Sequence, residues 1–260
     1  MKDTIKQFVL DMGVDDVGVT TTPCYHSPLS PDLKELFPEA KSIIVLAYRE
    51  LSSCDSPSVY LAMNGRMDMM EFSRSCNYKL ARYLEKEWYA RAMTVSFSYP
   101  LDMNSKTMGA VGELSLRHAA VAAGLGVMGR HNLVIHPRLG TRVLFTAVMT
   151  DLDLPADPML EEDLCTGCDI CVDNCPAGAL DQEGKTDVLK CLQHSQPYGI
   201  GGSMKFWNRF IKSNGEEQKK MFRGEEFLRL YQAASIGFQY YCFHCIKSCP
   251  VSMKKDQPGE

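Results

Sequence analysis

The spacing of the cysteines restricts what this chain can fold into more than any other feature. Four cysteines follow one another as C-x2-C-x2-C-x3-C and a proline comes directly after the last, at Cys165, Cys168, Cys171, Cys175 and Pro176. Three thiolates at intervals of three residues can wrap one tight loop around a corner of an iron–sulfur cubane, whereas the fourth, after a longer gap, points away to a second cluster. Zinc sites prefer closed sets of four ligands at other spacings. The run therefore predicts a domain built around 4Fe–4S clusters.

A second run of three cysteines ends in the same way, with Cys249 followed by Pro250. When the two endings are overlaid, Gln239 falls where the first run has Cys165, so one ligand is missing. Cys191 is the only other cysteine in this half of the chain, and it brings the number of candidate ligands to eight. An exchange of fourth ligands, as in bacterial ferredoxins, then predicts two metal sites: Cys165, Cys168, Cys171 and Cys249 for one 4Fe–4S cluster, and Cys175, Cys191, Cys242 and Cys245 for the other.

Two domains of different architecture are expected. Residues 1–155 show helical and strand patterns in alternation, and residues 156–260 hold the cysteine runs, with an insertion at 192–240 between them. The fold class is therefore an α/β (α+β) N-terminal domain followed by a bacterial-ferredoxin-like double 4Fe–4S domain. The expected helices are 2–12, 68–93, 111–123 and 214–235, the expected strands are 14–20, 42–48, 94–99 and 143–150, and the linker 151–161 and the segment 198–203 are expected to be irregular.

Charge and hydropathy exclude several classes of function. The net charge of −4 gives no basic footprint, which argues against nonspecific nucleic-acid binding. The longest apolar run, residues 43–47, is too short to cross a bilayer, and the N-terminus is amphipathic rather than a secretory leader. We therefore expect a cytoplasmic protein without membrane contact, whose abundant cysteines, eleven in all, indicate metal ligands rather than disulfides. Three cysteines lie outside the ligand pattern and are expected to be buried or idle: Cys24, Cys54 and Cys76.

The glycines of the segment AGLGVMGR form a G-x-G-x-x-G pattern at Gly124, Gly126 and Gly129. A dinucleotide site needs a strand before this pattern and a helix after it, whereas here an alanine-rich helix precedes and an apolar run follows. That context argues against a Rossmann site. Gly124 is expected to cap the preceding helix, and the other two glycines to let the backbone pass close to a bulky flat ligand.

A resemblance to a known family rests on six segments in a fixed order. They are AGLGVMGR, HNLVIHPRLGTRV, TAVMTDLDLP, CTGCDICVDNCPAGAL, VLKCLQH and YCFHCIKSCP. From about Phe8 to Pro250 the chain resembles the epoxyqueuosine reductase family, to which the reductive dehalogenases are related. The resemblance implies a cobalamin in an N-terminal domain similar to flavin nitroreductases, with two clusters that reduce its cobalt. It also implies that the cofactor is lined by Gly126, Gly129, Arg130, Asn132, Thr141 and Arg142.

The chain departs from that family in two places. The family continues past its clusters into helical repeats that help to hold transfer RNA, whereas this chain stops ten residues after Pro250. The family also has an aspartate, expected to donate a proton, whose place falls on or beside Ala110, where no acid stands. Glu113 and Tyr99 are alternative donors, and no catalytic residue is assigned. The histidines share no ligand spacing, although His244, between two cysteines, is expected to tune a cluster by hydrogen bonding.

These observations predict an anaerobic iron–sulfur oxidoreductase. Two 4Fe–4S clusters would take single electrons from an external donor of the ferredoxin or flavodoxin type and pass them to a bound cobalamin, which would reduce a small-molecule substrate. Because of the two departures, transfer RNA is not expected as a partner. Two alternatives stay open: a non-catalytic electron-transfer or corrinoid-reducing partner protein, and a flavin-dependent reductase.

Overall fold

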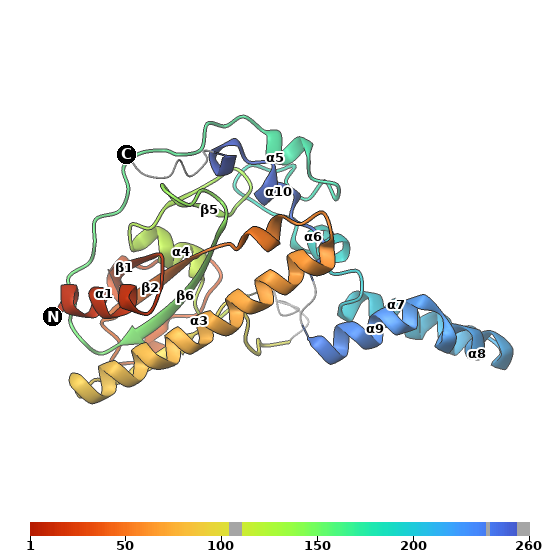
Figure 1. The fold of residues 1–260 in the computed structure, drawn as a ribbon, viewed down its shortest axis with the longest axis horizontal. Helices are drawn as coiled ribbons and strands as arrows, with labels where there is room; N and C mark the ends of the chain where they lie inside the picture. Colours follow the sequence, from red (N-terminus) through yellow and green to blue (C-terminus); the bar gives the residue numbers. More distant parts are fainter. Residues whose placement is uncertain (104–110, 238–239, 254–260) are drawn as a thin grey trace.

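The computed structural model describes residues 1–103, 111–237 and 240–253, and a four-stranded antiparallel sheet forms its centre (Figure 1). The strand order is β1 (Asp16–Thr21), β2 (Ser42–Arg49), β6 (Val143–Thr150) and β3 (Ala92–Val95). The register pairs Ser42 with Thr21 on one side and with Thr150 on the other. The expectation of a mixed α/β domain is confirmed.

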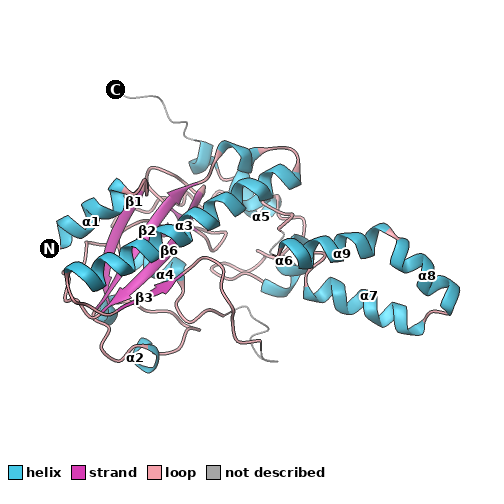
Figure 2. Cartoon of the chain, turned by 60° about the horizontal axis from the view of Figure 1, so that its bottom comes forward, coloured by secondary structure: helices cyan, strands magenta, loops and turns pink. Residues whose placement is uncertain are grey.

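Helices cover both faces of this sheet (Figure 2), which explains why its central strands read as uninterrupted apolar runs. Ile44 and Leu46 of β2 face the core that is shared with α1 (Lys2–Asp11) and α3 (Val59–Glu87). The alternate residues Ile43 and Val45 face a second core with α4 (Leu116–Ala122) and α2 (Leu33–Leu36). One strand therefore contributes to two hydrophobic layers.

Two of the helices expected in the first 155 residues differ from those observed. The long helix α3 begins at Val59 rather than at residue 68, because Ser58 already provides an extended N-cap, and it ends at Glu87. Tyr89 then takes a positive φ of 53°, which turns the chain into β3 by Ala92 instead of 94. The expected helix 111–123 is only α4, since the N–H of Glu113 donates to the hydroxyl of Tyr99 and not into a helical ladder.

The end of α4 is built as the sequence predicted. Gly124 has a φ of 72°, and its N–H donates to Val121 O at 3.0 Å while the next N–H, of Leu125, donates to Ala120 O at 2.9 Å. These two bonds form a Schellman motif, for which glycine is the preferred residue. The chain then enters a short hairpin of β4 (Val127–Met128) and β5 (Val134–Ile135).

The expected linker 151–161 contains no helix or strand, but it is fastened to the N-terminal domain. The carboxylate of Asp157 accepts from the amines of Lys2 at 2.8 Å and Lys6 at 2.9 Å, and from the N–H of Val19 at 2.8 Å. The backbone N–H of Asp157 donates to Val19 O at 2.7 Å. The segment is therefore a strap along α1 and β1.

The insertion forms a helical arm that projects from the rest of the molecule in both ribbon views. It consists of α7 (Ile200–Lys212), α8 (Gly215–Arg223) and α9 (Glu225–Ile236). The expected loop at 198–203 is wrong because α7 already begins at Ile200, and the single helix expected over 214–235 breaks at Gly224. Phe206, which is 1% exposed, holds the arm together through ring contacts with Phe210 and Phe227.

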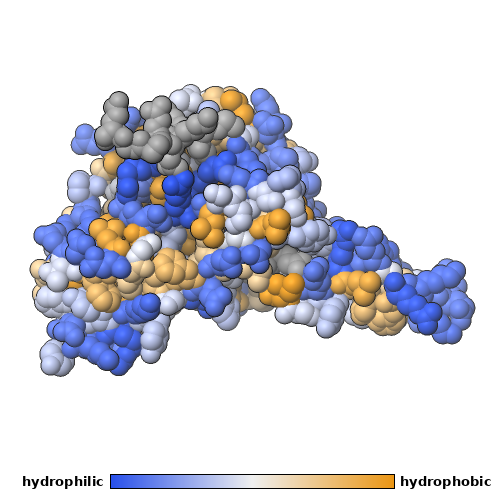
Figure 3. Space-filling model, viewed as in Figure 1, coloured by the Kyte–Doolittle hydropathy of each residue, from blue (hydrophilic) through white to orange (hydrophobic). Residues whose placement is uncertain are grey.

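The arm carries exposed apolar side chains, and Figure 3 shows apolar surface on part of it, with hydrophilic surface at its far end. On α7 these recur at helical intervals, as Ile200, Met204, Trp207 and Ile211. The remaining short helices lie around the cysteines: α5 (Ile170–Asp173), α6 (Val188–Ser195) and α10 (His244–Lys247). None of the helices in the described part of the chain is both long and apolar enough to cross a membrane.

Candidate metal centre and its surroundings

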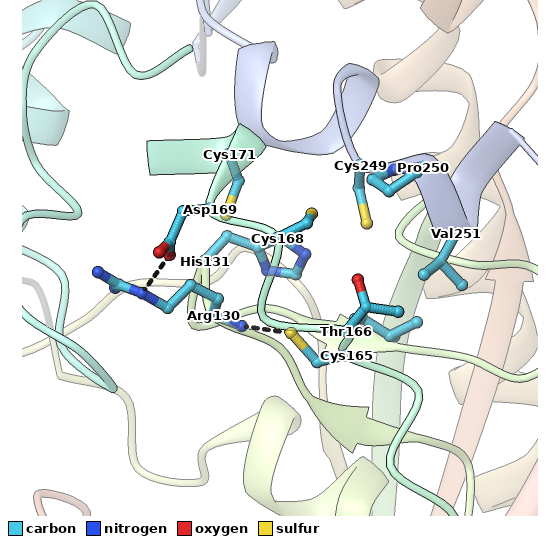
Figure 4. A pocket seen from close by; sticks show the side chains of 11 residues that line it. Arg130, His131, Cys165, Thr166, Cys168, Asp169, Cys171, Cys249, Pro250 and Val251 are labelled. Carbon is cyan, nitrogen blue, oxygen red and sulfur yellow. Dashed lines mark hydrogen bonds and ion pairs between the residues drawn. The ribbon is translucent and has the colours of Figure 1, made fainter. Parts of the chain in front are cut away.

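The first predicted cysteine set lines one pocket, which Figure 4 shows from close by. Cys165, Cys168 and Cys171 come from one loop, and Cys249 comes from the far end of the described chain. The loop can wrap tightly because Gly167 and Asp169 both take left-handed conformations, with φ of 64° and 56°. The structure therefore brings these four cysteines together as the sequence predicted, and their binding of a cluster stays a prediction.

The second predicted set, Cys175, Cys191, Cys242 and Cys245, also gathers in one place. Burial raises the pKa of Cys245 to about 12, and the charges of Cys242, Cys191 and Cys175 add to the rise. Burial likewise raises the pKa of Cys242, again with contributions from Cys191 and Cys175. Such mutually repelling thiolates need a positive metal core to stay deprotonated, so the electrostatics fit a metal site.

Both sets offer sulfur alone, which is the donor chemistry of iron–sulfur clusters. Within the ranges that the structure describes, no three histidine, cysteine or acidic side chains form a group placed to hold a single metal ion. The cysteines outside the pattern behave as expected in the structure: Cys54 and Cys76 are buried, Cys24 is exposed, and all three are free.

Arg130 lies against the first cysteine set rather than away from it. Its backbone N–H donates to Cys165 Sγ at 3.3 Å, and its Nε pairs with Asp169 Oδ1 at 2.9 Å. Its Nη1 donates to the carbonyl oxygens of Leu180 at 3.0 Å and Gln182 at 3.2 Å. The residue predicted to line a corrinoid thus fastens the cysteine loop to the β4–β5 hairpin.

The side chains of Asn132 and Thr141 also point towards the cysteine-bearing half of the chain. Asn132 Nδ2 donates to Thr186 Oγ1 at 3.2 Å, and the residue has a positive φ of 58°. Thr141 is buried and its hydroxyl donates to Ile246 O at 2.9 Å, on α10. Both side chains therefore contact the cysteine-bearing half of the chain.

Arg142 is different, because one N–H of its guanidinium makes no hydrogen bond with the described residues. The guanidinium pairs with Asp55, while Nε is buried and has no hydrogen-bond partner among the described residues. Buried donors are almost always paired in native proteins. Of the six residues predicted to line a cofactor, Arg142 is the one that keeps such a free buried N–H.

The two remaining predicted cofactor residues, Gly126 and Gly129, have reasons within the chain for being glycine. A Cβ on Gly126 would lie 2.5 Å from Ile135 O, and a Cβ on Gly129 would lie 2.7 Å from His131 Cε1. Both glycines therefore permit the close packing of the hairpin. Their contact with a flat ligand stays a prediction.

Arg66 belongs to a buried ion pair and also contacts the ring beside the second cysteine set. Arg66 is 8% exposed, and its Nη2 lies 2.9 Å from Glu50 Oε1. The Arg66 guanidinium also lies 3.5 Å from the ring centroid of Phe243, which directly follows Cys242. Burial raises the pKa of Glu50, and the charges of Arg66 and Arg142 oppose that rise. This cation–π contact across the molecule could not be read from sequence spacing.

The candidate proton donors lie before α4. Tyr99 accepts a hydrogen bond from the N–H of Glu113 at 2.9 Å, and burial raises the pKa of its phenol. The carboxylate of Glu113 is exposed and precedes the helix. Ala110, where the family's acid was expected, lies outside the described residues.

The spacing of the histidines assigned no role to His131, yet it lines the pocket of the first cysteine set. Burial lowers its pKa to about 4, so the imidazole is neutral at pH 7. His118 and His136 instead contact N-terminal residues, at 2.7 Å to Ser115 Oγ and 3.2 Å to Asp16 Oδ2. The nearby Gly129 was the one local feature of the sequence that could have indicated His131 as a pocket residue.

Comparison with known proteins identifies the cysteine loop and the fold. A family model described as a 4Fe-4S binding domain matches residues 158–181. Curated proteins named epoxyqueuosine reductase match from Staphylococcus aureus (29% identity, 74% of this chain, 55% of that protein) and Bacillus subtilis (25%, 98% and 64%). The chain thus spans between about half and two-thirds of the length of these relatives.

Solved structures agree at the level of the fold. An epoxyqueuosine reductase superposes with a TM-score of 0.63 at 21% identity, covering 98% of this chain and 66% of that one. A catabolic reductive dehalogenase superposes with a TM-score of 0.61 at 17% identity, covering 95% and 31%.

One of these structures bears on the expectation about transfer RNA. It is an epoxyqueuosine reductase with an epoxyqueuosine-modified tRNA stem loop, with a TM-score of 0.61 at 21% identity, covering 98% of this chain and 66% of that one. That protein therefore takes a tRNA stem loop, which conflicts with the expectation, drawn from the two departures, that transfer RNA is not a partner. With its 4Fe-4S binding segment, its mixed α/β fold and these relatives, the chain is a homologue of the epoxyqueuosine reductases.

Proposed function

We propose that this chain is an iron–sulfur reductase in which two 4Fe–4S clusters carry single electrons to a cobalamin bound by the N-terminal domain. Residues 1–155 would form the cofactor and substrate domain, of a nitroreductase-like type, and residues 156–260 the double-cluster domain with the arm as its insertion. The observation that supports this best is the gathering of eight cysteines into two sets with exchanged fourth members. An external ferredoxin or flavodoxin would supply the electrons.

Cobalamin is supported by a neighbour and by one side chain. A reductive dehalogenase structure described as suggesting a mechanism for B12-dependent dehalogenation superposes with a TM-score of 0.57 at 19% identity, covering 74% of this chain and 28% of that one. In this chain, the buried free Nε of Arg142 could donate to a polar group of the corrinoid. When bound, cobalamin would supply a strongly reducing cobalt centre.

The side chains of this protein would hold the electron-transfer path in place, and the cofactors would carry out the reduction. Arg130 fastens the first cysteine loop to the hairpin, and Thr141 fastens α10 to the segment before β6. Tyr99 would hold its phenolic proton at pH 7, since a phenol titrates near pH 10 and burial raises the pKa of Tyr99 further. It is a candidate acid for an oxygen leaving the substrate.

Two classes of substrate follow from different observations. The relatives' names and the bound stem loop favour an epoxyqueuosine base in transfer RNA. The lack of an acid at Ala110 favours a small molecule that needs no proton from that position. One experiment distinguishes the two substrate classes. The reduced protein is incubated with an epoxyqueuosine-containing stem loop and the nucleosides are analysed by mass spectrometry. Formation of queuosine selects the first class.

Metal and cofactor content test the cluster proposal directly. Oxygen-free isolation and reconstitution should give about eight iron atoms per chain, as two 4Fe–4S clusters require. Cys249→Ser and Cys191→Ser should each lose about four, one from each cluster, because each removes one thiolate ligand. The control Cys24→Ser should lose none, since Cys24 is exposed and outside both sets. Zinc, or iron for a single cluster in the unaltered chain, would overturn the proposal.

The same sample tests the second cofactor. Cobalamin added to the reconstituted protein should co-elute with it on gel filtration and show corrinoid absorption bands. Arg142→Met should weaken that retention if Nε contacts the corrinoid. Yellow flavin bands would select the flavin-dependent reductase, and clusters without either cofactor would select the electron-transfer protein.

A further inference from the structure

The imidazole of His131 lies inside the pocket of the first cysteine set (Figure 4). The residue is 4% exposed and stands in the turn between β4 and β5, directly after Arg130. That pocket is also lined by Cys165, Cys168, Cys171 and Cys249. The ring therefore faces the space that a cluster would fill.

One hydrogen bond fixes which nitrogen of the ring carries the proton. Nδ1 of His131 accepts from the backbone N–H of Leu133 at 3.1 Å. In a neutral imidazole one nitrogen accepts and the other donates, so Nε2 holds the hydrogen. Nε2 is buried and finds no hydrogen-bond partner within the described part of the chain.

The neighbouring glycine makes room for this ring. A Cβ on Gly129 would lie 2.7 Å from Cε1 and 3.1 Å from Nε2 of His131. Any other residue at 129 would push the imidazole out of its place. The backbone bond and the glycine together hold the ring in one orientation, which is how a donor is preorganised.

We propose that His131 Nε2–H donates a hydrogen bond to a sulfur of the cluster held by Cys165, Cys168, Cys171 and Cys249. The backbone N–H of Arg130, 3.3 Å from Cys165 Sγ, is a second donor to the same site. Reduction adds negative charge to the cluster sulfurs, so such donors stabilise the reduced form and raise the reduction potential. His131 thus sets the potential of the first cluster relative to the second. This inference rests on the proposed function, because it requires the cluster.

Potentials measured on both clusters test the inference. In redox titrations followed by electron paramagnetic resonance, His131→Leu should shift the first cluster to a more negative potential and leave the second unchanged. His131→Gln, which keeps an N–H donor, should recover part of the shift. The matched control His118→Leu removes a histidine that bonds Ser115 in the N-terminal domain, and both potentials should stay as in the unaltered protein.

Because a variant could lose the cluster, a second measurement uses the unaltered protein. In the unaltered protein with 15N-labelled histidine, pulsed resonance of the reduced first cluster should detect weak coupling to one nitrogen. No coupling, strong coupling typical of a direct ligand, or an unchanged potential in His131→Leu with full iron content would overturn the inference. Unaltered protein without iron would instead overturn the proposed function.

Discussion

At the scale of single residues, Gly124 is required by its conformation and by its surroundings together. Its φ of 72° is left-handed, and a Cβ there would lie 2.2 Å from the carbonyl oxygen of Pro158 in the strap. The helix end and the strap therefore meet at one residue. The sequence predicted the cap from the alanine-rich pattern before it, but the contact with Pro158 depends on how the strap returns.

The variant Gly124→Ala should lower the free energy of unfolding by about 2 kcal/mol, since a left-handed alanine alone costs about 1 to 2 kcal/mol and the contact with Pro158 adds strain. Anaerobic thermal unfolding followed by circular dichroism measures this. The control is Gly201→Ala in α7, where a Cβ meets nothing within 4 Å and the midpoint should stay or rise. Equal losses in both variants would contradict the argument.

At the scale of elements, apolar runs predicted the central strands well, whereas glycines led to the wrong prediction of a loop where α7 begins. Strand β2 was found as predicted to within one residue, because burial on both faces leaves a continuous apolar run. Helix α7 was missed because Gly201 and Gly202 lower helix propensity, whereas the rings packed around Phe206 stabilise the helix. Packing between segments therefore outweighed the local preference.

The strap gives a prediction for pH at this scale. Burial raises the pKa of Asp157, but hydrogen bonds from Lys2, Lys6 and the Val19 N–H outweigh it and hold the pKa below the usual range. A depressed carboxyl pKa stabilises the fold above the unfolded value of about 3.9, and this contribution disappears as pH falls through the folded pKa. Asp157→Asn should therefore be less stable than the unaltered chain at pH 7, and the difference should close below about pH 4.

Urea unfolding at a series of pH values checks this prediction. Asp153→Asn is the matched control, because Asp153 is an exposed acid in the same strap and should change little at any pH. A stability difference for Asp157→Asn that stays constant down to about pH 3 would show that the carboxylate charge does not fasten the strap.

At the scale of the whole molecule, the cysteine sets could be predicted from the sequence and the orientation of their neighbours could not. Spacing grouped seven of the eight cysteines, and Cys191 was added because it is the only other cysteine in this half of the chain. Nothing local indicated that Arg130, Asn132 and Thr141 would turn towards the cysteine-bearing half. Those contacts depend on how segments far apart in the sequence meet.

Arg66 makes the junction between the halves testable. Arg66→Ala would leave Glu50 buried without its partner and remove the contact with Phe243, at a cost of about 3 to 5 kcal/mol. Hydrogen exchange should then speed up in the peptide that spans the second cysteine run. The control Arg82→Ala removes an exposed pair with Glu85 and should leave exchange there unchanged. Unchanged exchange in both would place the junction elsewhere.

Cys249 belongs to the first pocket but is translated well after the other three cysteines of that set, with the arm between them. While the nascent chain is still growing, Cys165, Cys168 and Cys171 can form only an open face of three thiols. The fourth thiol, that of Cys249, is added only after the arm and the first two cysteines of the second run have been translated. Maturation of the first centre is thereby coupled to translation of the chain as far as Cys249, so a polypeptide released before that residue would lack the closing sulfur.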